Sequence, residues 1–155
     1  MVQADSLKKK LLIICGATAT GKTSLAVQCA KLLNTEIISA DSMNVYTGLN
    51  VGTAKPSFEE REGVVHHLID VASPFDRFTV GDYRELAMPV IDELHKQNKI
   101  PVICGGTGFY INSLLYKLSY GNGMGDMSVR NKYKSIAEEK GNEAVHEILK
   151  DKDPI

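Results

Sequence analysis

Eight consecutive residues of the sequence have the spacing of a phosphate-binding loop. Residues 16–23 read GATATGKT and match the pattern G-x-x-x-x-G-K-[ST]. Glycines let the backbone fold around an anion so that successive N–H groups point inward, and the lysine adds a full positive charge. The hydroxyl of the last residue is placed to hold Mg²⁺ beside the phosphates. We therefore expect a diphosphate or triphosphate site, with Mg²⁺ at Thr23, formed by Gly16, Ala17, Thr18, Ala19, Thr20, Gly21, Lys22 and Thr23.

A carboxylate follows the second apolar run of the sequence. Asp41 comes directly after residues 36–40, which read EIISA and predict a short buried strand. Ligands of open parallel sheets bind outside the carboxyl ends of the strands, so Asp41 should face the same crevice as the phosphate-binding loop. There it can hold Mg²⁺ through water or accept a proton from a nucleophile. An aspartate that only caps a loop is the alternative.

Apolar runs alternate with helical patterns along the first three quarters of the chain. Such alternation favours a parallel sheet with helices on both faces, because parallel strands need long crossover connections. We therefore predict an α/β fold, with a P-loop NTPase-like parallel sheet, followed by a short helical segment. The expected strands are 10–15, 36–40, 67–71 and 100–104, of which 10–15 and 100–104 should be fully buried, and the expected helices are 22–33, 79–98 and a short one ending near 116.

Local patterns within the expected helices make sharper predictions. Thr79 and Asp82 have the spacing of a capping box, which starts a helix. Pro89 lies inside that helix, where we expect a kink or a break. In the helix after the phosphate-binding loop, the face that should pack on the sheet consists of Leu25, Ala26, Cys29, Leu32 and Leu33.

The composition and the hydrophobic pattern of the sequence change after residue 118. Residues 120–125 contain three glycines and are expected to form a hinge or a disordered loop. Residues 126–153 predict two short polar helices, broken near Gly141. We therefore divide the chain into a core of residues 1–118 and a second segment of residues 119–155. Because the chain stops without a capping pattern or a closing strand, we interpret it as the start of a longer, truncated protein.

Composition limits the class of protein. The chain has 155 residues, of which 43% are hydrophobic and 24% charged, as in ordinary globular proteins. No apolar run approaches the roughly 18 residues of a membrane span, and we expect a cytoplasmic monomer without membrane contact. The formal net charge is −1, so the basic excess that usually marks a nucleic-acid binder is missing. The three cysteines have no close pair and are expected to be buried free thiols: Cys15, Cys29 and Cys104.

Taken together, the motifs resemble those of the tRNA dimethylallyltransferases, also called tRNA isopentenyl transferases. The resemblance is dense over residues 10–118 and weaker from 126 to 155, where Val129-Arg130 and Asp153-Pro154 continue it. The combination of Asp41-Ser42 with residues 52–56 is much more specific than the phosphate-binding loop alone. The segments that carry the resemblance are GATATGKT (16–23), IISADSMNVY (37–46), GTAKP (52–56), HHLID (66–70), FTVGDYR (78–84) and IPVICGGTGFY (100–110).

This resemblance implies a reaction and a role for each matching residue. The loop would hold the diphosphate of dimethylallyl diphosphate, and the dimethylallyl group would pass to N6 of an adenosine next to the anticodon of a tRNA, with loss of pyrophosphate. Asp41 would take or orient the N6 proton, and Thr107, also catalytic, would contact the substrate from the other side. Arg130 would contact the tRNA anticodon stem-loop. The path of the flipped adenosine would be lined by Asp41, Ser42, Met43 and Asn44.

Three other functions stay open at the level of the sequence. An adenylate prenyltransferase, which acts on a free nucleotide, shares the start of the glycine-rich loop. A small-metabolite or nucleoside kinase would also use the loop and Asp41, although the sequence contains no obvious Arg-rich lid. A truncated chain could bind a phosphate ion and catalyse nothing.

Five further residues allow more than one interpretation. Lys55 could reach a phosphate or the tRNA backbone, or it could lie in a surface loop. His66 and His67 are neighbours in the chain and should point to opposite faces of a strand, so we expect a structural role for them. Tyr46 and Tyr110 could stack on a base, but we expect them to pack in the core.

Overall fold

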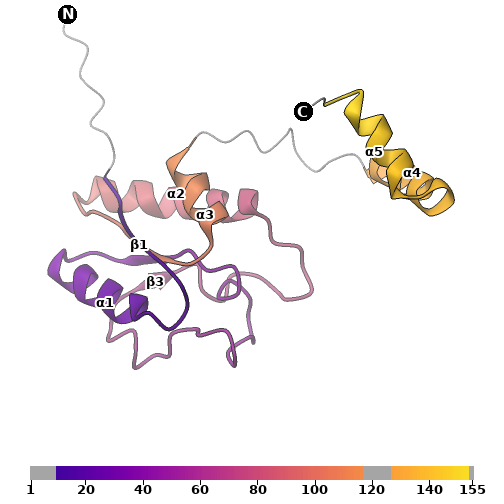
Figure 1. Cartoon of the computed structure of the whole chain (residues 1–155). Coiled ribbons are helices and arrows are strands. Elements are labelled where there is room, and N and C mark those ends of the chain that lie inside the picture. Colours follow the sequence, from indigo (N-terminus) through magenta and orange to yellow (C-terminus); the bar gives the residue numbers. More distant parts are fainter. Residues whose placement is uncertain (1–9, 117–126, 154–155) are drawn as a thin grey trace, which may run out of the picture. The chain divides into compact units, whose positions relative to one another are not determined.

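The computed structural model describes residues 10–116 and 127–153. The chain divides into two compact units, residues 1–118 and residues 119–155 (Figure 1). The hinge predicted at residues 120–125 lies outside the described residues. None of the helices formed by residues 10–116 and 127–153 has the length and hydrophobicity of a membrane-spanning segment.

The first unit is built on a parallel sheet of four strands in the order β1-β4-β2-β3. This arrangement confirms the predicted α/β fold, in which strands and helices alternate along the chain. The strands are β1 (Leu12–Cys15), β2 (Ile37–Ser39), β3 (His66–His67) and β4 (Val102–Gly105), and the helices are α1 (Lys22–Leu32), α2 (Val80–Lys96) and α3 (Gly108–Leu115).

The register of the sheet places the ends of three strands at one level. Cys104 of β4 lies opposite Ile14 of β1 on one side and opposite Ser39 of β2 on the other. The phosphate-binding loop follows β1, and Asp41 follows β2. Because the strands are parallel, both segments leave the sheet at the same edge.

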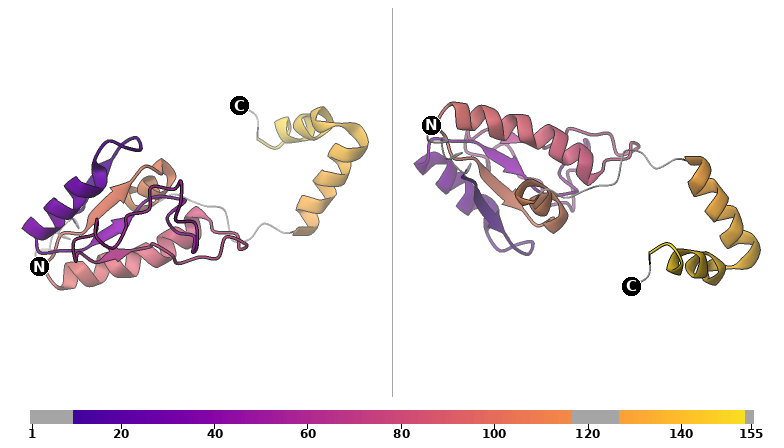
Figure 2. Two further views of the ribbon diagram at one scale, coloured as in Figure 1. Left: turned by 90° about the horizontal axis from the view of Figure 1, so that it is seen from below. Right: turned by 90° about the horizontal axis from the view of Figure 1, so that it is seen from above.

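Helices cover both faces of this sheet. Successive strand residues point to opposite faces, so Ile37 and Val102 pack in the core under α1, while Ile38 and Ile103 pack with Tyr83 of α2 and with residues of α3. Figure 2 shows α1 and α2 on opposite sides of the strands. The three-layer arrangement therefore follows from the alternation of apolar side chains in strands that are only three or four residues long.

The face of α1 that packs on the sheet differs from the predicted one. Its buried residues are Ala26, Val27 and Ala30. Leu25 is 51% exposed and Leu32 is 86% exposed, so the prediction that these leucines pack on the sheet is wrong. Two alanines one turn apart let the helix backbone approach the strands closely, which leaves the larger leucines at the side of the contact.

The first strand is less buried than its sequence predicts. β1 lies at the edge of the described sheet, and its residues are half-buried or exposed rather than fully buried. Within the described sheet, β1 has a neighbouring strand, β4, on one side only. All three cysteines are free thiols, but Cys15 is exposed and Cys29 and Cys104 are partly buried, so the prediction of three buried thiols is wrong.

The capping box of α2 forms as predicted. The Asp82 N–H donates to Thr79 Oγ1 at 3.3 Å, and the Thr79 N–H donates to Asp82 Oδ2 at 2.7 Å. Hydrogen bonds from Thr79 hold the pKa of Asp82 below its ordinary value. The helix then runs through Pro89 without a break. Pro89 and Glu85 are both exposed, so water can bond the Glu85 carbonyl that lacks its usual N–H partner.

The third predicted strand, residues 67–71, is mostly absent. β3 consists of His66–His67 alone. The chain then adopts left-handed backbone at Leu68 (φ 61°) and Asp70 (φ 58°), which interrupts an extended conformation. A parallel bridge between Tyr46 and Ala72 takes its place.

Two helices lie within residues 127–153, the described part of the second unit, as predicted. They are α4 (Met127–Lys140) and α5 (Asn142–Lys150). Gly141 separates them with a φ of 85°, a conformation that glycine adopts without strain. The predicted break near Gly141 is therefore confirmed.

The capping box yields a prediction for stability. Thr79→Ala removes the acceptor of the Asp82 N–H and should lower the free energy of unfolding by about 1 kcal/mol, measured by urea denaturation at neutral pH. The folded-state pKa of Asp82 is depressed, so its stabilisation is present above the unfolded pKa of about 4 and is lost as the pH falls through the folded value. The difference between variant and wild type should therefore shrink in acid.

Ser135→Ala is the control, because this hydroxyl bonds only within exposed α4. A Thr79→Ala protein as stable as wild type at neutral pH would contradict the role of the capping box.

Candidate functional site

The phosphate-binding loop connects the end of β1 with the start of α1. Ala19 has a φ of 63° and Gly21 a φ of 81°, so the loop turns twice through left-handed backbone. The carbonyl of Ala17 accepts hydrogen bonds from the Thr20 hydroxyl at 2.8 Å and from the Lys22 ammonium. The lysine therefore folds back over its own loop, beside the position where the motif holds phosphate.

A cavity of about 450 Å³ brings the loop and Asp41 together. Of the residues predicted for the site, residues 18–23, Asp41 and Asn44 line this cavity. Arg130 lies in α4, in the second unit. The predicted site residues outside the cavity lining are Gly16, Ala17, Ser42, Met43 and Thr107.

The Asp41 carboxylate closes a turn, and Asp41 is also a lining residue of the cavity. Its Oδ1 accepts hydrogen bonds from the N–H groups of Met43 at 2.8 Å and Asn44 at 3.4 Å, as aspartate does in a turn. Burial raises the pKa of the Cys104 thiol, while Lys22 lowers it and Asp41 raises it further. Cys104, Lys22 and Asp41 all line the cavity.

Close contact between β2 and β4 holds the Asp41 turn. A Cβ atom at Gly105 would lie 2.2 Å from the carbonyl oxygen of Ala40, so only glycine fits there. The Thr107 N–H donates to the same carbonyl at 3.0 Å, and the Ser42 N–H donates to Thr107 Oγ1 at 2.9 Å. Thr107 therefore supports the residues on both sides of Asp41.

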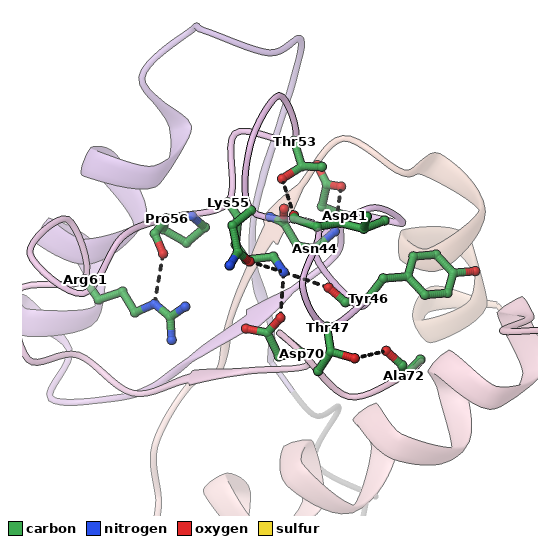
Figure 3. A network of polar contacts seen from close by, with 12 residues as sticks. Asp41, Asn44, Tyr46, Thr47, Thr53, Lys55, Pro56, Arg61, Asp70 and Ala72 are labelled. Atoms are coloured by element: carbon green, nitrogen blue, oxygen red, sulfur yellow. Dashed lines mark hydrogen bonds and ion pairs between the residues drawn. The ribbon is translucent and has the colours of Figure 1, made fainter. Parts of the chain in front are cut away.

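Lys55, which also lines the cavity, lies in a network of polar contacts (Figure 3). The ammonium donates to the Tyr46 carbonyl at 2.7 Å, to Asn50 Oδ1 at 3.1 Å and to Asp70 Oδ1 at 2.6 Å. The Lys55 side chain is 5% exposed. The interpretation of Lys55 as a surface-loop lysine is therefore wrong, and its ammonium is bound to protein acceptors. Contact with a phosphate or with the tRNA backbone stays a prediction.

Other residues of the cavity lining were not predicted as site residues. His66, Glu60 and Pro56 belong to it. Burial is the main cause that lowers the pKa of His66, whose Nδ1 lies 2.9 Å from the Val64 carbonyl oxygen. His66 and Pro56 belong to the HHLID (66–70) and GTAKP (52–56) segments, which the sequence motifs single out. The position of these segments in the sequence does not indicate that they lie near the phosphate-binding loop.

The neighbouring histidine and two tyrosines have structural roles. His67 Nε2 lies 2.5 Å from Glu36 Oε2. Tyr110 stacks on Tyr83 with ring centroids 4.0 Å apart, and burial raises the pKa of Tyr110 to about 12. Tyr46 packs against the same core cluster. The prediction that both tyrosines pack is confirmed.

Comparison with known proteins identifies the family to which the chain belongs. A family model described as IPP transferase matches residues 44–155, which is most of the chain. The chain belongs to the IPP transferase family. This membership confirms the resemblance drawn from the motifs of the sequence.

Curated relatives in the IPP transferase family are named tRNA dimethylallyltransferase. Those of Acetivibrio thermocellus and Alkaliphilus metalliredigens are 49% identical over 144 residues and 47% identical over 148 residues. The alignments cover 93% and 96% of this chain but only 46% and 47% of the relatives. The chain thus spans about half the length of the curated relatives that it matches.

Solved structures of the IPP transferase family share the fold. The tRNA isopentenylpyrophosphate transferase of Bacillus halodurans is 43% identical, with a TM-score of 0.71 over 95% of this chain and 48% of that one. A eukaryotic dimethylallyltransferase acting on tRNA is 29% identical, with a TM-score of 0.78 over 94% of this chain and 36% of that one.

The contact at Gly105 yields a prediction for the site. Gly105→Ala places a methyl group against the Ala40 carbonyl and should lower the free energy of unfolding by about 2–3 kcal/mol, measured by urea denaturation. Gly108→Ala is the matched control, because a Cβ there meets nothing within 4 Å and position 108 begins α3. Equal stability of the two variants would contradict the close approach of β4 to Ala40.

Proposed function

We propose that the full-length protein transfers a dimethylallyl group from dimethylallyl diphosphate to the N6 amine of an adenosine next to the anticodon of a tRNA. One observation carries the proposal: residues 18–23 and Asp41 line a single cavity in a chain of the IPP transferase family. Relatives named tRNA dimethylallyltransferase favour tRNA over a free nucleotide as the acceptor, and they give no support to a kinase. The activity is assigned to the full-length protein because the chain spans half of these relatives.

The donor diphosphate would lie on the phosphate-binding loop. Breaking the allylic C–O bond leaves the bonding electrons on the departing pyrophosphate. Inward N–H groups of residues 18–23 and the Lys22 ammonium would stabilise that charge as it develops. Lys22 donates to the Ala17 carbonyl in the free loop, and a phosphate oxygen would take the place of that carbonyl.

Magnesium is the expected metal at Thr23. The part of the chain that is described contains no group of three or more His, Cys, Asp or Glu side chains that could hold a metal ion. Thr23 lines the cavity, and its hydroxyl together with phosphate oxygens and water makes the all-oxygen set that Mg²⁺ prefers. When bound, Mg²⁺ would neutralise charge on the leaving pyrophosphate.

The cavity also suits the apolar part of the donor. Ile37, Ala54, Pro56 and Ile69 contribute to its lining. These side chains supply apolar surface among the polar groups of the cavity. We place the five-carbon dimethylallyl group against these side chains.

The acceptor amine would approach from the side of Asp41. As the new N6–C bond forms, the amine loses a proton, which Asp41 takes or orients. Both hydrogen bonds of the Asp41 turn use Oδ1, so Oδ2 is the oxygen that we assign to the amine. The adenosine has to leave its stack to reach the cavity, as in other base-modifying enzymes.

Further contacts with the tRNA are part of the same proposal. Ser42, Met43 and Asn44 follow Asp41 in its turn and would line the path of the flipped adenosine. Thr107, which holds this turn through Ser42, would act on the substrate from the other side. Arg130 of α4 would contact the anticodon stem-loop.

The test is transfer of a labelled dimethylallyl group to a tRNA anticodon stem-loop by the full-length protein. We expect transfer by the wild type with release of pyrophosphate. ATP turnover without prenyl transfer would refute the proposed function.

Two variants separate the roles of the donor and acceptor sides. Asp41→Asn keeps an oxygen for the turn but removes the charge, and it should lower kcat by at least about 100-fold while pyrophosphate binding, measured by calorimetry, is retained. Lys22→Ala should weaken pyrophosphate binding by about 10- to 100-fold. Asp76→Asn, an exposed aspartate, is the control. Equal loss of pyrophosphate binding in the Asp41 and Lys22 variants would contradict this division.

A further inference from the structure

The ammonium of Lys55 has a protein acceptor for each of its three N–H groups. These acceptors are the Tyr46 carbonyl, Asn50 Oδ1 and Asp70 Oδ1, at 2.7, 3.1 and 2.6 Å (Figure 3). An ammonium has no further donors. Lys55 therefore binds neither phosphate nor RNA unless it gives up one of these partners.

Burial distinguishes this lysine from a surface ion pair of the same length. Lys31 Nζ and Glu62 Oε2 also lie 2.6 Å apart, but their side chains are 48% and 57% exposed. The Lys55 side chain is 5% exposed and that of Asp70 is 40% exposed. Removing one partner of a buried charge leaves polar groups without compensation, whereas exposed pairs contribute little. The two lysines thus form a matched pair for comparison.

The partners of Lys55 belong to the segments that shape one side of the cavity. The Asp70 N–H donates to the Asn44 carbonyl at 3.0 Å, and the Val71 N–H donates to the Val45 carbonyl at 2.8 Å. Asp70 keeps a left-handed backbone, with a φ of 58°. Through Asp70, the ammonium is connected to the turn that begins at Asp41 and contains Asn44.

Two parts of the cavity lining depend on these contacts. Residues 54–56 contribute one part, and Asp41 with Asn44 contributes another. Asn44 is 7% exposed, and among the described residues its Oδ1 atom is buried without a hydrogen-bond partner. Asn44 therefore belongs to the cavity wall as a largely buried side chain. Its position depends on the backbone that Lys55 and Asp70 tie together.

We propose that Lys55 is a positioning residue for the acceptor: its ammonium fixes residues 54–56 against the turn of Asp41 and Asn44, so that the entering adenosine meets both side chains in the reactive orientation. This inference rests on the proposed function. It assigns Lys55 no contact with the diphosphate, because Lys22 and the loop N–H groups hold the donor. Loss of Lys55 therefore impairs use of the acceptor and spares binding of the donor's diphosphate, which lies on the phosphate-binding loop.

The test compares Lys55→Met with Lys31→Met in the full-length protein. Small errors in substrate position cost reactions of this kind on the order of 100-fold in rate. For Lys55→Met we expect a loss of that order in kcat/KM for the anticodon stem-loop, with the Kd of pyrophosphate unchanged within about twofold. Lys31→Met should match the wild type in both. Lys55→Arg, which keeps the charge and N–H donors, should recover part of the loss.

Asp70→Asn keeps the test decisive if Lys55→Met fails to fold. It removes the charge of the partner and should lower kcat/KM for the stem-loop more than it changes the Kd of pyrophosphate. Unchanged stem-loop kinetics in a folded Lys55→Met protein, or in Asp70→Asn, would overturn the inference. A parallel loss of pyrophosphate binding and stem-loop use would also overturn it. Absence of transfer by the wild type would instead refute the proposed function.

Discussion

The approach of Gly105 to the carbonyl of Ala40 is the constraint on which the site depends. A side chain at position 105 would collide with the end of β2, since even a Cβ would lie 2.2 Å from that oxygen. Without one, β4 lies between β1 and β2 and pairs with both. The phosphate-binding loop and Asp41 consequently leave the sheet at neighbouring positions, and Thr107 holds the turn between them through Ser42.

The charged groups of the site have separate tasks. Lys22 and the loop N–H groups suit an anion, whereas Asp41 suits a group that loses a proton. Lys55 has a different task from Lys22 and Asp41, because its ammonium donates to three acceptors within the protein, one of which is Asp70. In the proposed transfer, the phosphate-binding loop would hold the donor and the turn of Asp41 would position the acceptor.

Features encoded over a few neighbouring residues could be predicted from the sequence. Each of these features depends on residues close together in the sequence: the loop motif, the strand before the loop, the capping box of Thr79 and Asp82, and the break at Gly141. Features set by distant contacts could not. The buried face of α1 depends on how closely Ala26 and Ala30 approach the sheet, and the burial of Cys15 depends on which strands flank β1. The partners of Lys55 lie 5, 9 and 15 positions away, in segments without a helical or strand period, so the sequence pattern does not indicate the network.

A crystal structure of the protein with pyrophosphate and Mg²⁺ would show whether the loop and Asp41 form one site. We expect an anion held by the N–H groups of residues 18–23, with the Lys22 ammonium transferred from the Ala17 carbonyl to a phosphate oxygen and the Asp41 carboxylate facing the anion across the cavity. An anion bound elsewhere, or an Asp41 carboxylate turned out of the cavity, would contradict it.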